Sequence, residues 1–240
     1  MKQISLKTVA IVTLGIDFLA VASAILRAII LQRSPMRYFG ENGYVTWVSI
    51  IQLLIIAVLC WKISNLRKNE LSSSVSSPKK QPVIFWRISA IGMFFFALDE
   101  GLKIHENLDR SLHRLLQQEV TPLSSRLDDF IILFYAAAGL FIVYLFKEEF
   151  KNFVTAYYWF IWGLVFSFLT ILLDMIGHDR ETFAPFAENL QQLNDIHHWF
   201  SAVEEIPKIL AGGAFIVALY HCLLVAKLLK SQLNPHFHSH

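Results

Sequence analysis

Cysteine is nearly absent from this sequence, and the two residues present exclude a disulfide scaffold. Cys60 and Cys222 both lie inside apolar segments, where a thiol behaves as a small apolar side chain. The pair therefore indicates neither a disulfide framework nor a thiolate metal site. An excess of charge of one sign is also missing, because the formal net charge is +2 and the basic residues lie in loops rather than on one face. This distribution argues against a nucleic-acid partner.

Internal repeats and a removable leader are missing as well. No repeat of fixed period is visible, so we expect a single domain over residues 1–240. The first apolar run contains Asp17 and Arg27, and no small-residue cleavage site follows it. It is too long and too polar for the apolar region of a secretory signal, and we interpret it as a retained helix.

Apolar residues are abundant: they make up 55% of the chain, with 20 phenylalanines. Soluble domains average roughly 45–50%. The sequence therefore predicts an all-α, polytopic transmembrane helix bundle in the lipid bilayer. Six windows are long enough to cross a bilayer, at about 8–31, 45–66, 83–106, 127–146, 153–177 and 199–229. The serine-rich, lysine-containing stretch 69–81 predicts a flexible cytoplasmic loop.

The distribution of lysine and arginine near the helix ends predicts the orientation, since cytoplasmic loops hold the excess of basic residues. With the N-terminus inside, twelve basic residues lie on the cytoplasmic side and seven on the other. We therefore expect both termini in the cytoplasm.

This orientation places polar residues from four predicted helices in one layer on the outer side. The segment 97–110 contains Asp99, Glu100, His105 and Glu106 at the end of an otherwise apolar helix. The next helix begins with Asp128 and Asp129, the fifth ends with Asp174 and His178, and the sixth carries His197, His198, Ser201, Glu204, Glu205 and Lys208. Ionisable groups at membrane depth are costly and are often functional.

Imidazole and carboxylate side chains at this depth favour a zinc or iron site. Asp174 and His178 lie four residues apart on one helical face and are the first candidate ligands. The other candidate ligands are His105, His198, Asp99 and Glu204. The expected activity is that of an intramembrane metal-dependent hydrolase of a lipid-like substrate, with Glu100 or Glu205 as general base and Ser201 lining the pocket.

A simpler interpretation is that these residues lie at helix ends, where interfacial water and headgroups tolerate charge. Asp128 and Asp129 fit a helix N-terminus, where the macrodipole favours carboxylates. Asp17, near the middle of the first helix, requires a partner or protonation. Two pairings of Lys208 stay open, one with Asp17 and one with Glu204 in the same helix.

The segment FFFALDEGLKIHENLDR resembles an "LDE, then HE" signature of uncharacterised bacterial and cyanobacterial multi-pass membrane proteins, and EEIPKILAGGAF resembles the acidic-pair helix near their C-termini. This resemblance implies a bacterial inner membrane and supplies no activity. The outer histidines and aspartates also resemble the zinc site of the alkaline ceramidase superfamily of intramembrane hydrolases. In this chain His197 and His198 are adjacent rather than four residues apart. The alternative function is a non-enzymatic one: a small transporter, a proton relay or a structural factor with charge-paired helices.

Overall fold

A computed structural model describes residues 4–40, 42–73, 81–104, 107–108, 127–177 and 179–233. The candidate ligands His105 and His178, and most of the predicted loop 69–81, lie outside these ranges. The described part is an all-α helical bundle without a strand, as the apolar runs predict. Its elements are α1 (Leu6–Ile30), α2 (Met36–Phe39), α3 (Tyr44–Ser73), α4 (Gln81–Leu102), α6 (Leu127–Leu145), α7 (Lys147–Phe150), the 3₁₀ helix η2 (Lys151–Ala156), α8 (Tyr157–Gly177), the 3₁₀ helix η3 (Arg180–Phe186) and α9 (Leu190–Leu233).

Length and hydropathy make this a membrane protein. Five helical segments are long and apolar enough to span a bilayer, and α6 contributes a shorter apolar segment, Phe130–Leu145. Large apolar side chains such as Phe18, Phe134 and Phe168 are about two thirds exposed on the bundle surface. Such a surface is suited to lipid, because lipid tails are as apolar as these side chains.

Three helix boundaries differ clearly from the sequence expectation. Helix α3 continues to Ser73, past the predicted end at 66, so the first five residues of the predicted loop 69–81 are helical. The fifth predicted window began at residue 153, whereas α8 begins at Tyr157 because η2 precedes it. The sixth began at residue 199, whereas α9 begins at Leu190. The side chain of Asn189 accepts a hydrogen bond from the Gln192 amide, at 2.9 Å, and thereby caps the first turn of α9. The His197 and His198 side chains are consequently parts of a helix rather than of a loop.

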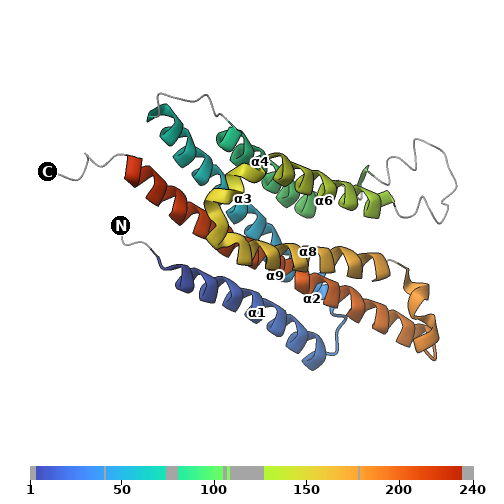
Figure 1. The fold of residues 1–240 in the computed structure, drawn as a ribbon. Coiled ribbons are helices and arrows are strands. Elements are labelled where there is room, and N and C mark those ends of the chain that lie inside the picture. The colour runs from blue at the N-terminus through green and yellow to red at the C-terminus, as the bar shows by residue number, and fades with distance from the viewer. Residues whose placement is uncertain are drawn as a thin grey trace.

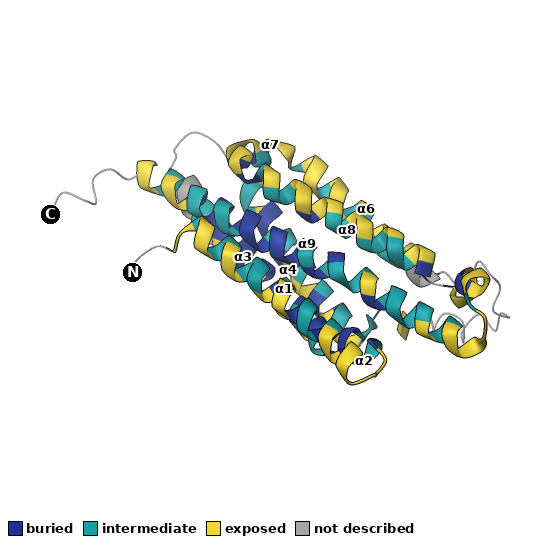
Figure 2. Cartoon of the chain, turned by 90° about the horizontal axis from the view of Figure 1, so that it is seen from below, coloured by how far each residue is buried: buried dark blue, intermediate teal, exposed yellow. Residues whose placement is uncertain are grey.

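Helix α9 is the element against which most of the others pack (Figure 1). Its principal neighbours are α8, α3 and α1, while α4 packs chiefly against α3. Both ends of the chain lie at one end of the bundle, here called the terminal end, and the opposite end is the distal end. The hydroxyl of Tyr220 donates to the Ile4 carbonyl at 2.8 Å, which fixes the start of the chain to α9. The buried residues follow α9 and α3 through the centre of the bundle (Figure 2).

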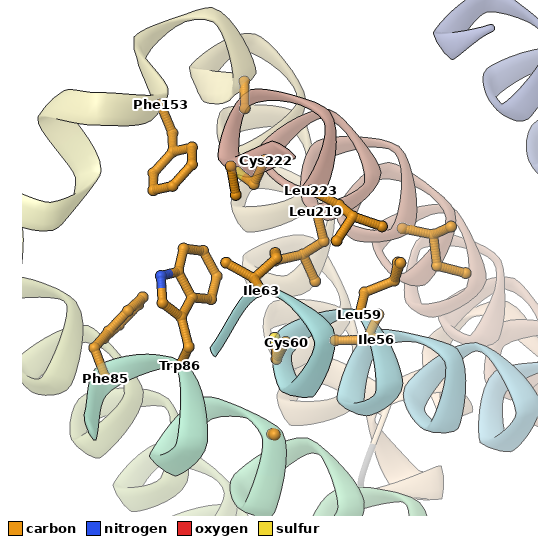
Figure 3. Packing of buried hydrophobic residues seen from close by; sticks show 14 residues of the cluster. Ile56, Leu59, Cys60, Ile63, Phe85, Trp86, Phe153, Leu219, Cys222 and Leu223 are labelled. Atoms are coloured by element: carbon orange, nitrogen blue, oxygen red, sulfur yellow. The ribbon is translucent and has the colours of Figure 1, made fainter. Parts of the chain in front are cut away.

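The buried apolar residues form two separate clusters. The terminal core contains Ile56, Leu59, Cys60, Ile63, Phe85, Trp86, Ala90, Phe153, Ala156, Ile216, Leu219, Cys222, Leu223 and Ala226 (Figure 3). The distal core contains Ala24, Ala28, Tyr38, Phe39, Val45, Ala202 and Ile209. Both draw on α3 and α9, and the buried polar residues Thr46, Ser49 and Gln52 lie on α3 between the two clusters.

Candidate functional site

Helix α9 presents different residues to each of its neighbours, since successive residues are about 100° apart around a helix. Toward α8 it presents Phe200 and Glu204, which lie against Gly177. Toward α3 it presents Gly212, against the side chain of Gln52, and toward α1 it presents Gly213, against the carboxylate of Asp17. Gly212 and Gly213, which are adjacent on α9, therefore contact different helices.

Lys208 is the centre of the largest of these contacts. Its ammonium nitrogen lies 2.8 Å from Oε1 of Glu100 on α4 and 2.5 Å from Oε2 of Glu205, one turn earlier on α9. All three side chains are partly buried, with exposed fractions of 26%, 22% and 19% for Lys208, Glu100 and Glu205. A lysine three residues after a glutamate lies on the same helical face, which accounts for the second pair.

Two further acids adjoin this group. Glu204 and Asp174 interact electrostatically with each other, and both interact with Glu205. Gly177 ends α8 and leaves room for Glu204, because a Cβ at that position would lie 3.0 Å from its Oε2. We call Lys208, Glu100, Glu205, Glu204 and Asp174 the Lys208 cluster. It joins α4, α8 and α9 near the distal ends of α4 and α8.

Four other candidate residues do not belong to the Lys208 cluster: His197, His198, Asp99 and Ser201. The ring of His198 shares a hydrogen bond of 3.3 Å with the Ser34 hydroxyl, after α1. His197 instead faces α8, where its Nε2 donates to the Gly177 carbonyl at 3.1 Å. Asp99 is buried, with 7% exposure, and interacts electrostatically with Tyr135 of α6. Ser201 is partly buried on α9.

The structure describes only part of the candidate metal site, so the metal prediction stays untested. His105 and His178 lie outside the described residues, and His198 contacts Ser34. Within the described ranges, no group of three or more histidine, cysteine, aspartate and glutamate side chains is arranged to hold a metal ion. The acids Glu100, Asp174, Glu204 and Glu205 do lie together, as the shared depth of their helices predicts.

Asp17 has a partner that the sequence analysis did not consider. Nε2 of Gln52 on α3 donates to its Oδ1 at 2.7 Å, and both side chains are buried. Lys208 forms ion pairs with Glu100 and Glu205. The two pairings proposed for it, with Asp17 and with Glu204, are therefore wrong. Gln52 was missed because a single glutamine in an apolar helix gives no indication of what it faces.

A second charged cluster was also missed, at the terminal end. Arg67 of α3 contacts both carboxylate oxygens of Glu149, at 2.8 and 2.7 Å. The indole nitrogen of Trp86 donates to the same carboxylate at 2.9 Å, and the Asn152 amide donates to it at 3.2 Å. We call these four residues the Arg67 cluster. Arg67 and Glu149 are 82 positions apart, so only the tertiary fold brings them together.

Comparison with known proteins gives a family but no activity. A family model described as "Domain of unknown function (DUF8692)" matches residues 6–223. The match extends from α1 into α9 and includes every residue of both charged clusters. No curated protein and no solved structure matches the chain.

Proposed function

The chain belongs to this family, and from its geometry we propose that the Lys208 cluster is a cation-binding site of a small membrane carrier or relay, with the proton as its cation. The observation that carries the proposal is the contact of one lysine with two carboxylates, with a third glutamate beside them. This arrangement places more negative than positive charge in a partly buried site.

The charges in contact are unequal. Lys208 supplies one positive charge, and Glu100 and Glu205, both in contact with it, supply two negative charges when ionised. No hydrogen bond or ion pair of Glu204 is recorded within the described part of the chain, although Glu205 and Asp174 are close enough to repel it. An ionised carboxylate away from bulk water is costly unless it is paired. Protonation of a glutamate, or binding of another cation, removes this cost.

The same contact also couples the charge state to the arrangement of the helices. Helix α4 packs chiefly against α3, and the ion pair of Glu100 with Lys208 links it to α9. If a cation replaces the lysine at Glu100, this link is released. A site that exchanges its cation in this way has the two states that a carrier or relay requires.

For the orientation we propose that the terminal end is cytoplasmic, in a bacterial inner membrane. The support is the excess of lysine and arginine at the helix ends on that side. The Lys208 cluster then lies in the outer half of the membrane. Labelling of a single cysteine introduced at Ser231, at the described end of α9, tests the assignment: reagent that cannot cross the membrane should not react in intact cells.

Proton flux into proteoliposomes tests the proposed activity. With an imposed potassium diffusion potential and a trapped pH dye, liposomes containing the protein should acidify faster than empty ones. Glu204→Gln should reduce the rate at least about tenfold, equivalent to about 1.4 kcal/mol. Glu181→Gln is the matched control, since Glu181 is exposed on η3, and should keep the full rate. Equal rates for the protein, Glu204→Gln and empty liposomes would refute the proposal.

A metal-dependent hydrolase of a lipid-like substrate is the second candidate. The observation that favours it is the convergence of Asp174, Glu204 and His197 on the last turn of α8. Zinc or iron bound there would activate water. Metal analysis of the purified protein, wild type against Asp174→Ala and His178→Ala, tests this candidate. Metal content that is absent, or unchanged in both variants, would exclude it.

A further inference from the structure

A second polar site lies in the middle of the bundle, between the two apolar cores. On α1, Asp17 follows Val9 of the terminal core's periphery and precedes Ala24 of the distal core. On α3 and α9, Gln52 and the pair Gly212 and Gly213 occupy the same intermediate level. We call these four residues the Asp17 site. Asp17 is 1% exposed and Gln52 5% exposed.

Only one of the two side-chain oxygens of Asp17 accepts a hydrogen bond, and the side-chain oxygen of Gln52 accepts none. Gln52 Nε2 donates to Asp17 Oδ1, whereas the other oxygen of each group, Oδ2 of Asp17 and Oε1 of Gln52, is buried without a hydrogen-bond partner. Two acceptors are left and no donor serves them. An unsatisfied buried acceptor costs about 1–3 kcal/mol, and an unpaired buried charge costs more.

Adjacent glycines on α9 create the space that these two oxygens occupy. A Cβ on Gly213 would lie 2.1 Å from Asp17 Oδ2, and a Cβ on Gly212 would lie 2.3 Å from Gln52 Oε1. Any other residue at either position would displace the polar groups. The site is therefore enclosed by backbone on the α9 side.

No charged side chain is recorded facing Asp17 from the elements packed against it. From α3 it meets the neutral Gln52, and from α9 it meets the two glycines. Lys208 lies one turn before Gly212, but its ammonium contacts Glu100 and Glu205. The described surroundings thus offer no counter-ion to an ionised Asp17.

We propose that the Asp17 site binds a proton, so that Asp17 is a neutral acid whose Oδ2 hydroxyl donates to Oε1 of Gln52. One proton on Oδ2 supplies the missing donor and closes a ring of two hydrogen bonds between a carboxylic acid and an amide. No other atom has to move to a new partner. The site goes beyond the proposed function, because it uses separate residues and stands whether or not the Lys208 cluster exchanges cations.

Substitution by the isosteric amide gives a sharp test. In Asp17→Asn the carboxamide offers an N–H where the acid has its O–H, so the ring with Gln52 is kept. The melting temperature in detergent at neutral pH should therefore stay within about 2 °C of wild type or rise. Gln52→Leu removes the partner and should lower it by more than about 5 °C, as expected for a loss of about 2 kcal/mol in a chain of this length.

Infrared spectroscopy tests the proton itself. At neutral pH the wild-type protein should show the carbonyl stretch of a protonated carboxyl group, and the difference spectrum against Asp17→Asn should contain that band. Glu204→Gln, measured in the same way, separates any contribution of the Lys208 cluster. The flux assay measures proton movement driven by a membrane potential, whereas this assay measures a bound proton at equilibrium, so each proposal fails independently.

Two results would overturn the proposal. One is a loss of more than about 5 °C in Asp17→Asn together with no acid carbonyl band, which would mean that Asp17 is ionised. The other is a wild-type melting temperature that falls when sodium chloride is replaced by choline chloride while Asp17→Asn shows no such change. Sodium, not a proton, would then be the ligand.

Discussion

The two charged clusters differ in how completely their charges are matched. In the Arg67 cluster one guanidinium meets one carboxylate in a two-pronged contact, and Trp86 and Asn152 donate the remaining hydrogen bonds. In the Lys208 cluster one ammonium contacts two carboxylates, and Glu204 adds further negative charge nearby. Both lie between helices that are distant in sequence.

This difference favours a structural role for the Arg67 cluster and cation exchange at the Lys208 cluster. A fully paired and hydrogen-bonded charge gains nothing from a proton or another cation, so the Arg67 cluster is suited to fixing α3 and α4 to the α7 turn. A cluster with surplus carboxylates is stabilised by an added cation. Arginine also holds its proton in proteins, whereas glutamate exchanges its own readily.

The largest effect is expected from breaking the matched cluster. Glu149→Gln removes the carboxylate that the Arg67 guanidinium contacts, in a site where the glutamate side chain is 4% exposed. Removing one partner of a buried ion pair costs about 3–5 kcal/mol. We expect about 3 kcal/mol, because the amide keeps one acceptor, measured as the free energy of unfolding in an SDS titration.

The neighbouring residue supplies the control. Glu148→Gln removes the same charge from an ion pair with Lys151 in which both side chains are about 70% exposed. An exposed pair contributes about 0–1 kcal/mol, so this variant should unfold like wild type. Equal effects of the two substitutions would mean that the Arg67 cluster does not anchor the fold.

A smaller and pH-dependent effect is expected in the unmatched cluster. Lys208→Met leaves Glu100 and Glu205 without their cation, and a lost hydrogen-bond partner at charged groups costs about 1–3 kcal/mol. Because Glu205 is partly buried, we expect it to hold a proton in the folded variant that the unfolded chain releases at neutral pH. Stability therefore rises as the pH falls, and the deficit relative to wild type shrinks.

The comparison becomes sharper when the loss in free energy of unfolding is measured for Glu149→Gln and for Lys208→Met over the same pH range. The deficit of Glu149→Gln should persist from neutral to mildly acidic pH, because the arginine left behind stays charged. A deficit of Lys208→Met that is independent of pH would show that its glutamates do not take up protons. The Lys208 cluster would then keep a fixed charge over this pH range, as the Arg67 cluster does.

The extent to which this fold could be predicted depends on the kind of signal. Long apolar runs predict helices because a bilayer demands them, and the shared depth of Glu100, Asp174, Glu204 and Glu205 follows from those helices alone. The direction of each side chain around its helix does not follow. His197 and His198 are adjacent, yet only His197 meets α8 and His198 meets Ser34, because the position of α8 around α9 is a tertiary property.

Other differences have local causes. The start of α9 at Leu190 was missed because the stretch up to Ile196 is too polar to count as membrane-spanning, although Asn189 followed three residues later by Gln192 is typical of a helix N-terminus. Glu149 lies in the short turn between α6 and α8, where hydropathy carries no information about partners. Its role depends on Arg67 and Trp86, which are far away in the sequence.

The smallest effect is expected at the glycines of the α8 and α9 contact. A Cβ on Gly177 would lie 2.9 Å from ring atoms of Phe200 and 3.0 Å from Glu204 Oε2, whereas one on Gly163 would lie 2.6 Å from the ring of Phe215. Overfilling a packed contact costs about 1–3 kcal/mol. We expect about 1 kcal/mol for each alanine variant, and a gain of up to about 1 kcal/mol for Gly92→Ala, where the Cβ meets nothing within 4 Å.

Function should separate the two alanine variants that stability does not. Gly177→Ala displaces Glu204, so proton flux in proteoliposomes should fall along with stability. Gly163→Ala presses only on the Phe215 ring, which lies against the terminal core, and flux per folded molecule should be unchanged. If both variants lose flux equally, the loss reflects the spacing of α8 and α9 rather than the glutamate. Helix packing, and not the charge of Glu204, would then account for the flux.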